Sequence, residues 1–224
     1  MLANDAGVDA AKSFVASAGL AADTVRVVAS VEKPRTFADV RGGDAYFINN
    51  QGRCSIGFPV VVGFVSAGHC GKAGARVTNS SGASEGTFQA SSFPDNDYSW
   101  VKTTANFKPV GVVNHYDGTT VAVKGSQEAA VGASICRSGS TTGWHCGTVQ
   151  AKNSTVRYQE GPVSGLTRTD VCAEPGDSGG SWISGNQAQG VTSGGSGDCK
   201  SGGTTYFQPV NEILSTYRLT LVTS

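Results

Sequence analysis

The stretch Cys172-Ala173-Glu174-Pro175-Gly176-Asp177-Ser178-Gly179-Gly180 is the most informative part of this 224-residue sequence. It places one serine, Ser178, among three glycines and a proline. Glycines permit a tight turn on which a hydroxyl is exposed and backbone amides point toward a bound group. The stretch therefore indicates a nucleophilic Ser178, although a simple hairpin turn in a glycine-rich protein also fits these residues.

A serine hydroxyl needs a base to remove its proton, and histidine titrates nearest to neutral pH. The chain has three histidines. His69 follows the apolar run Pro59–Val65, which we expect to be one buried strand, and small residues before it leave room for an imidazole. His115 lies in a surface-turn sequence and His145 in an expected disulfide loop. His69 is therefore the candidate base, and the other two are expected to be structural.

The base in turn needs a carboxylate that fixes its tautomer. Asp177 adjoins Ser178, and neighbouring side chains on an extended turn diverge, so it does not readily reach His69. Asp97 stands at the entry to a predicted strand, where its carboxylate could be buried and fixed. Asp95, beside a proline, is the alternative, and either residue could instead be a solvated loop acid.

Charge and composition exclude several classes of protein. The chain has 17 Lys+Arg and 17 Asp+Glu, a net charge of zero, which removes the electrostatic case for a nucleic-acid binder or a membrane-surface protein. Its 31 glycines are about twice the usual share of roughly 7%. No apolar run approaches the roughly 18 residues of a membrane span, and Met1 to Leu20 lacks the apolar core of a secretory signal.

The six cysteines are even in number and contain no Cys-x-x-Cys pair. Together with sparse charge and abundant Gly, Ser and Thr, they favour an oxidising compartment outside the cytoplasm and three disulfides. The adjacent pairs His69-Cys70 and His145-Cys146 suggest a metal site. Structural zinc sites use more closely spaced ligands, however, so we expect no metal.

From Pro34 onward, short β-type runs bounded by Gly, Asn, Asp and Pro recur about every 8 to 12 residues, which is typical of an all-β barrel or sandwich. The N-terminal part differs. There the sequence predicts a helix over Asp9–Ala18, stopped by Gly19, and a strand over Thr24–Val31. Pro209 opens a short C-terminal helix with an apolar face.

The order His69, Asp97, Ser178 resembles that of the chymotrypsin-like serine proteases, and most closely their secreted bacterial branch, the streptogrisin and α-lytic protease group. The resemblance covers roughly residues 37–224 and favours Asp97 over Asp95. It is carried by the blocks Arg53–Phe58, Ala67–Cys70, Asn96–Tyr98, Cys136–Gly139, Trp144–Gly147, Cys172–Gly180 and Thr192–Gly197.

The resemblance implies an all-β fold of two six-stranded antiparallel β-barrels with a short C-terminal helix. Residues 1–36 would be the tail of a pro-region, with processing near Thr36-Phe37-Ala38, and residues 37–224 the protease domain. The implied disulfides are Cys54–Cys70, Cys136–Cys146 and Cys172–Cys199.

The implied activity is that of a secreted, monomeric serine endopeptidase that is made as a zymogen. It would act on protein or peptide substrates without metal or cofactor, with its own pro-region as folding aid and inhibitor. His69 would be the base, Asp97 its orienting acid and Ser178 the nucleophile, with the amides of Gly176 and Ser178 as the oxyanion hole. Arg137 would pair with Asp177 and shape the oxyanion turn.

The resemblance also suggests a substrate site. Ser193-Gly194-Gly195 would pair with the substrate backbone, because glycines leave the adjacent pocket open. Ala173 precedes the serine turn, and no aspartate stands where trypsin-like enzymes place one. We therefore expect a large apolar or aromatic residue before the scissile bond. Glu174 near the rim could extend this preference to basic residues.

Three alternatives remain: a protease-like fold that only binds, a latent precursor, and a disulfide-bonded β-sandwich that binds carbohydrate. The last is suggested by the Ser, Thr, Asn and Gly content and by three tryptophans. A serine-directed phosphonate separates them, because only the enzyme gives a single adduct on Ser178.

Overall fold

The computed structural model describes residues 5–21, 24–27, 38–49 and 52–224. Its contacts divide the chain into residues 1–36 and 37–224. In the first unit, helix α1 (Asp5–Ser17) is the predicted helix, and it begins earlier than expected. Gly19 follows it with a left-handed φ of +67°. The strand expected over residues 24–31 is absent from residues 24–27, and the remainder lies outside the described residues.

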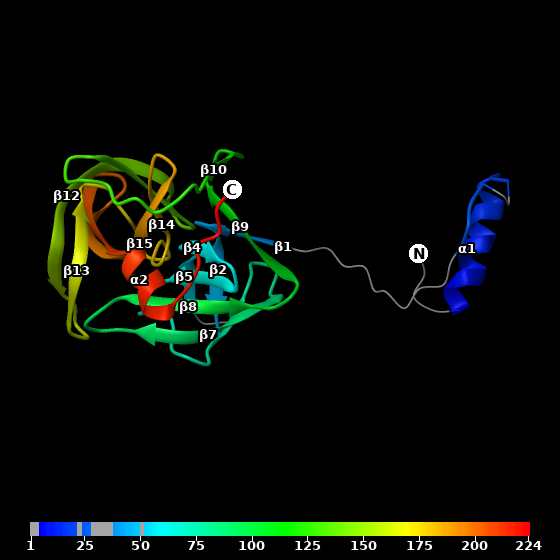
Figure 1. Ribbon diagram of the computed structural model, residues 1–224, viewed down its shortest axis with the longest axis horizontal. Helices are drawn as coiled ribbons and strands as arrows, with labels where there is room; N and C mark the ends of the chain where they lie inside the picture. The colour runs from blue at the N-terminus through cyan, green and yellow to red at the C-terminus, as the bar shows by residue number, and fades with distance from the viewer. Residues whose placement is uncertain (1–4, 22–23, 28–37, 50–51) are drawn as a thin grey trace. The chain divides into compact units, whose positions relative to one another are not determined.

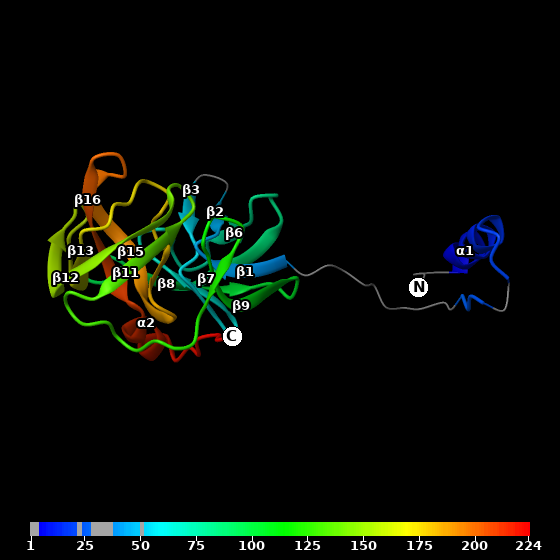
Figure 2. The ribbon, with the colours of Figure 1, turned by 90° about the horizontal axis from the view of Figure 1, so that it is seen from above.

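The second unit consists of two β-rich halves and helix α2 (Figures 1 and 2). The first half contains β1 (Ala38–Gly42), β2 (Ala45–Ile48), β3 (Gly52–Ser55), β4 (Phe58–Val60), β5 (Gly63–Ser66), β6 (Arg76–Thr78), β7 (Ser84–Ser92), β8 (Tyr98–Thr103), β9 (Phe107–Asn114) and β10 (Thr120–Ala122). The second half contains β11 (Ser134–Gly139), β12 (Gly143–Arg157), β13 (Pro162–Thr169), β14 (Ser181–Ser184), β15 (Gln187–Asp198) and β16 (Gly202–Pro209), followed by α2 (Val210–Tyr217).

The second half is a closed barrel in the order β11-β12-β13-β16-β15-β14, and every neighbouring pair is antiparallel. Its interior holds Trp182 and Phe207, whose stacked ring centroids lie 5.1 Å apart, with Ile135 and Val149 beside them. The six-stranded barrel predicted for this half is confirmed. Because the sheet closes on itself, the β-sandwich alternative is wrong.

The first half is barrel-like but more divided. It has a seven-stranded sheet in the order β3-β2-β6-β7-β8-β5-β4 and a three-stranded sheet, β1-β9-β10. Tyr46, Phe64, Phe88 and Val101 pack in its core. It differs from the implied six-stranded antiparallel barrel because several of its strands are short and β1 runs parallel to β9. The two-barrel architecture is otherwise confirmed.

Two runs fold differently from the predicted strands. Residues 59–65 are not one buried strand. Instead, β4 and β5 form a hairpin with Val61 and Val62 exposed at its turn. A continuous apolar run looks the same whether it forms one buried strand or a hairpin of two short strands, so the sequence pattern could not distinguish these two structures. Conversely, the sequence has two separate β-type runs at Gly147–Ala151 and Ser154–Tyr158, but β12 continues past Asn153, which has a φ of +54°, as one strand with irregular register.

A shared apolar cluster joins the two halves. It includes Phe58 and Tyr98 from the first half, Ile183 and Val191 from the second, and Ile213 from α2. Helix α2 is thus the predicted C-terminal helix, and it lies against β15 and β16 (Figure 1). Neither α1 nor α2 is long and apolar enough to cross a membrane.

The structure contains the disulfides Cys54–Cys70, Cys136–Cys146 and Cys172–Cys199. These are the pairs that the family resemblance implies. The first joins β3 to the residue after His69. No cysteine is free in the described part of the chain.

Glu85 on β7 is a buried residue whose carboxylate has one unpaired oxygen among the described residues. The residue is 3% exposed, and its Oε2 has no hydrogen-bond partner. It borders a cavity of about 260 Å³ that Asp44 and Phe107 also line. Burial raises the pKa of Glu85 to about 7, and the negative charge of Asp44 contributes to the rise.

Glu85→Gln is expected to stabilise the protein at alkaline pH. Because the folded-state pKa of Glu85 is raised, its ionisation destabilises the fold. About 3 kcal/mol of stability, present below pH 4.5, is lost as the pH rises through 7. Glutamine carries no charge, so Tm should exceed that of the parent by roughly 6–12 °C at pH 9 and match it at pH 4. Glu128→Gln, at an exposed ion pair with Lys152, is the control. An equal shift at both pH values would contradict this prediction.

Candidate active site

A pair of neighbouring strands brings His69 and Asp97 together. β5 ends shortly before His69, and β8 begins immediately after Asp97. The two strands are antiparallel with Ser66 opposite Ser99, so these ends adjoin. His69 Nδ1 lies 2.8 Å from Asp97 Oδ2, and the His69 amide donates to Asp97 Oδ1 at 2.9 Å.

Asp97 is fully buried and is held from the second half. Ser193 Oγ donates to Asp97 Oδ2 at 2.6 Å, and the Asp97 amide donates to Gln208 Oε1 at 3.0 Å. The Tyr158 hydroxyl lies 3.0 Å from Ser193 Oγ. Sequence reasoning missed Gln208 and Tyr158, because these contacts join segments far apart in the chain and no motif marks them.

Asp95, the alternative acid, is engaged elsewhere. Its φ is +79°, its amide donates to Pro162 O at 2.9 Å, and its carbonyl accepts from the Ser164 amide at 3.0 Å. Within the described residues, the carboxylate hydrogen-bonded to His69 is that of Asp97.

Opposing effects act on the pKa of His69. Burial lowers it, whereas the hydrogen bond and the negative charge of Asp97 raise it, and the charge of Glu160 adds to the rise. The net pKa lies above the ordinary value for imidazole. When Nδ1 donates to Asp97, Nε2 is left as the atom that can accept a proton.

The serine turn leaves two backbone amides free. Gly176 and Gly179 adopt left-handed φ values of +99° and +79°, which glycine tolerates. The amides of Asp177 and Gly179 donate to backbone carbonyls, whereas those of Gly176 and Ser178 meet no acceptor among the described residues. Two free amides beside a hydroxyl can bind a developing oxyanion.

Ser178 is held beside the His69 segment. Its carbonyl accepts from the Ser55 amide at 2.8 Å. Ser55 follows Cys54, which is bonded to Cys70, the neighbour of His69. Among the hydrogen bonds of the described residues, none joins Ser178 Oγ to His69. In enzymes without bound substrate, such contacts are often long and tighten only in the complex.

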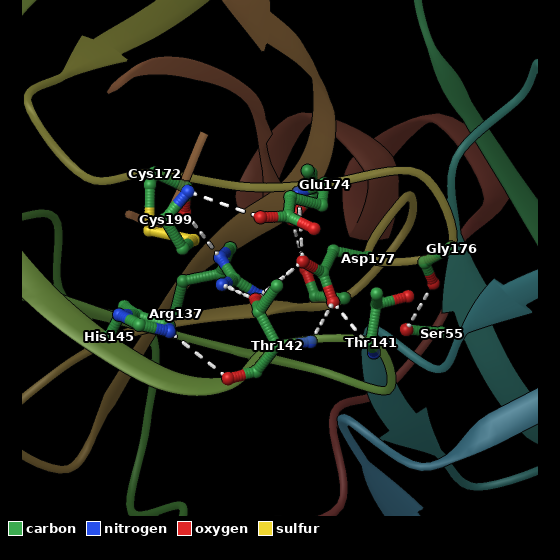
Figure 3. Close-up of polar contacts among 12 residues, drawn as sticks. Ser55, Arg137, Thr141, Thr142, His145, Cys172, Glu174, Gly176, Asp177 and Cys199 are labelled. Atoms are coloured by element: carbon green, nitrogen blue, oxygen red, sulfur yellow. Dashed lines mark hydrogen bonds and ion pairs between the residues drawn. A yellow bond between two sulfur atoms is a disulfide. The ribbon is translucent and has the colours of Figure 1, made fainter. Parts of the chain in front are cut away.

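Arg137 and Asp177 form a fully buried ion pair beside the turn (Figure 3). Arg137 Nη1 lies 3.3 Å from Asp177 Oδ2, and Arg137 Nε donates to Cys172 O at 3.0 Å. Asp177 Oδ1 also accepts from the amides of Thr141 and Thr142. Burial lowers the pKa of Arg137, and the charge of Asp177 opposes this. These contacts tie β11 to the serine turn.

A cavity of about 320 Å³ opens next to Ser178. Ser193 does not line it: its side chain is turned to Asp97 and borders a neighbouring cavity beside His69. Four of the predicted substrate-binding residues do line it, namely Ala173, Glu174, Gly194 and Gly195.

Glu174 is the one acidic residue in that lining. Its Oε1 accepts a hydrogen bond from the Cys199 amide at 3.2 Å, and its own amide donates to Asp177 Oδ2 at 3.0 Å (Figure 3). The carboxylate is therefore tied to the chain near the Cys172–Cys199 disulfide.

The other two histidines have structural contacts. His115 lies against Trp144 with ring centroids 4.4 Å apart, and its Nδ1 is 2.9 Å from Asp117. His145 Nε2 lies 3.0 Å from the carbonyl oxygen of Thr142.

Sulfur and imidazole atoms approach one another in two places, around His69 and around His145. In both groups the sulfurs belong to a disulfide, which carries no thiolate to bind a metal. The groups are Cys54, His69, Cys70 and His145, Cys172, Cys199, each with its ligand atoms within 4.8 Å of one another.

A two-barrel fold, a histidine paired with a buried aspartate, and a serine turn with two amides that meet no acceptor among the described residues define the chymotrypsin-like class. A family model described as Trypsin matches residues 49–216. The chain belongs to the trypsin family, in the group that includes the bacterial streptogrisins.

Three proteins illustrate this similarity. Streptogrisin-C of Streptomyces griseus is 57% identical in an alignment 228 residues long, which covers 100% of this chain and 50% of that protein. Glutamyl endopeptidase 2 of Streptomyces griseus is 42% identical over 187 residues, 81% of this chain and 99% of that protein. The crystal structure of Cellulomonas bogoriensis chymotrypsin is 60% identical with a TM-score of 0.80, covering 83% of this chain and 100% of that one. The chain spans about half the length of streptogrisin-C.

Proposed function

We propose that this chain is a serine endopeptidase that cleaves peptide bonds through Ser178, His69 and Asp97. The main support is the 2.8 Å contact between His69 Nδ1 and Asp97 Oδ2, next to a serine turn with two free amides. An imidazole held in one tautomer can remove the proton of a serine hydroxyl.

The reaction proceeds in two halves. Ser178 Oγ bonds to the substrate carbonyl carbon while its proton passes to His69 Nε2. As the C–N bond breaks, that proton passes to the leaving amine, and an acyl ester remains on Ser178. Water then attacks the ester as His69 takes its proton, and the proton returns to Ser178 Oγ when the acid leaves. Each step uses only groups of the chain, the substrate and water.

The oxyanion formed in each half is assigned to the amides of Gly176 and Ser178. The Arg137–Asp177 pair supports their placement, because Asp177 lies between these two residues and is anchored by its buried partner. Both partners are side chains within residues 37–224, so Asp177 needs no free N-terminal amine as its partner.

For the substrate, we propose a preference for large apolar or aromatic residues before the scissile bond. The lining of the cavity next to Ser178 includes Ala173 and three glycines, and its one acidic residue is Glu174 rather than an aspartate. The similarity to a protein named chymotrypsin supports this preference. The relative named glutamyl endopeptidase shows that specificity varies among such proteins, so it needs its own test.

Hydrolysis of matched peptides with Phe, Arg or Glu before the scissile bond tests both proposals. We expect kcat/KM to be highest for Phe and to vanish for all three in Ser178→Ala. Activity that persists in Ser178→Ala would contradict the endopeptidase mechanism. A higher kcat/KM for Glu or Arg would contradict the proposed preference alone.

Glu174→Gln is expected to leave the ratio of kcat/KM for Phe and Arg peptides nearly unchanged. The carboxylate is tied to the Cys199 amide, and a partly exposed charge contributes at most about 1 kcal/mol to a cationic side chain. A loss of Arg cleavage greater than about tenfold, which exceeds that energy, would instead assign Glu174 to the recognition of basic residues.

We also propose that residues 1–36 are the tail of a pro-region and that the protease is secreted as a zymogen and works as a monomer. The three disulfides and the family support an oxidising compartment. The predicted processing site near Thr36-Phe37-Ala38 includes residues outside the described part. N-terminal sequencing of active material should give a start near residue 37. Active protein that still begins at Met1 would contradict the processing.

A further inference from the structure

The amide of Gly176 can bind an oxyanion only if its peptide plane faces the right way. In a trans peptide the C=O and N–H point in opposite directions, so the orientation of Pro175 O fixes that of the Gly176 N–H. Thr141 Oγ1 donates to Pro175 O at 2.7 Å. This hydrogen bond holds Pro175 O toward Thr141 and so directs the Gly176 N–H away from it.

Thr141 is itself oriented from the other half of the fold. Arg53 on β3 donates from Nη2 to Thr141 Oγ1 at 2.8 Å and from Nη1 to Ser140 O at 3.1 Å. A threonine hydroxyl has a single hydrogen. Since Oγ1 accepts from Arg53, that hydrogen remains available for Pro175 O.

The next peptide plane is fixed separately. Ser55 Oγ donates to Gly176 O at 2.8 Å (Figure 3), and Ser140 Oγ lies 3.2 Å from the same oxygen. Gly176 thus lies between two held peptide planes with a φ of +99°. A Cβ at this position would stand 2.4 Å from Thr141 Oγ1 and 2.6 Å from Arg53 Nη2, so glycine is required there.

We propose that Thr141, oriented by Arg53, is a positioning residue that sets the Gly176 amide for oxyanion binding. This inference rests on the proposed function and adds two residues to which the sequence analysis assigned no role. Neither side chain acts on the substrate directly. They act by preventing rotation of the Pro175–Gly176 peptide, which would point a carbonyl at the oxyanion instead of an amide.

The test compares Thr141→Val, which loses the hydroxyl at nearly the same shape, with Thr141→Ser, which keeps it. We expect Thr141→Val to lower kcat on a Phe peptide by about 10- to 100-fold, somewhat less than the loss of a whole oxyanion donor. KM should change little. Its affinity for a peptide trifluoromethyl ketone, which forms an anionic adduct, should fall in parallel, and its affinity for the product peptide should not. Thr141→Ser should restore both kcat and the affinity for the trifluoromethyl ketone.

End-point labelling of Ser178 by a fluorophosphonate counts the folded sites in each preparation, so misfolding is not mistaken for a loss of kcat. A kcat within threefold of the parent for Thr141→Val, or an equal loss in Thr141→Ser, would overturn the proposal. An unmodified chain that neither takes the label nor cleaves peptides would instead overturn the proposed function.

Arg53 provides a second test. Arg53→Met alone should lower kcat about threefold to tenfold. Combined with Thr141→Val it should cause little further loss of kcat, because both substitutions act through the hydrogen bond from Thr141 Oγ1 to Pro175 O. Fully multiplicative losses would contradict the coupling and remove Arg53 from the proposal.

Discussion

Asp97→Asn should lower kcat for peptide hydrolysis by about 10⁴-fold. The His69 amide donates to Asp97 Oδ1, so the asparagine must keep its oxygen there and place its NH₂ at the Oδ2 position. That NH₂ would donate to His69 Nδ1 and leave the proton of the imidazole on Nε2. A protonated Nε2 cannot accept the proton of Ser178.

Asp95→Asn is the matched control for this substitution, since it makes the same chemical change two residues away. It should keep kcat within about threefold of the parent, because surface changes away from a site have small effects. Steady-state assays from pH 5 to 10 on the Phe peptide would measure both variants. A loss below tenfold in Asp97→Asn, or comparable losses in the two variants, would contradict the assignment of Asp97.

Arg137→Met should destabilise the protein by about 3–5 kcal/mol, because it leaves the fully buried carboxylate of Asp177 without its cation. The expected fall in Tm is roughly 6–20 °C. Melting curves recorded in the Ser178→Ala background avoid self-digestion. The double variant Arg137→Met/Asp177→Asn should recover part of the loss, because no buried charge remains.

Arg168→Met is the control for Arg137→Met. Arg168 is exposed on β13 and takes part in none of the salt bridges among the described residues, so its loss should change Tm little. If the two methionine variants melted alike, the buried ion pair would not stabilise the serine turn.

Features with a local cause were predictable from the sequence. The glycines around Ser178 permit left-handed turns, which Gly176 and Gly179 adopt. The apolar face that follows Pro209 became α2. The disulfide pairs and the Arg137–Asp177 contact came only from the family resemblance, because cysteine spacing does not determine connectivity.

What the sequence did not predict depends on contacts between distant segments. Gln208 and Ser193 hold Asp97 from the second half, and Arg53 reaches Thr141 across the two halves. A polar residue on a strand carries no signal of its partner. The burial of Glu85 is similar, since nothing beside it in the sequence shows that this residue of β7 is buried next to a cavity.

Mass spectrometry after exposure to a fluorophosphonate tests most directly whether one hydroxyl is activated by its neighbours. The unmodified chain should gain one adduct, located on Ser178, and both Ser178→Ala and His69→Ala should gain none on the same time scale. An adduct that persists in Ser178→Ala, or labelling of Ser178 at an undiminished rate in His69→Ala, would contradict the activation of Ser178 by His69.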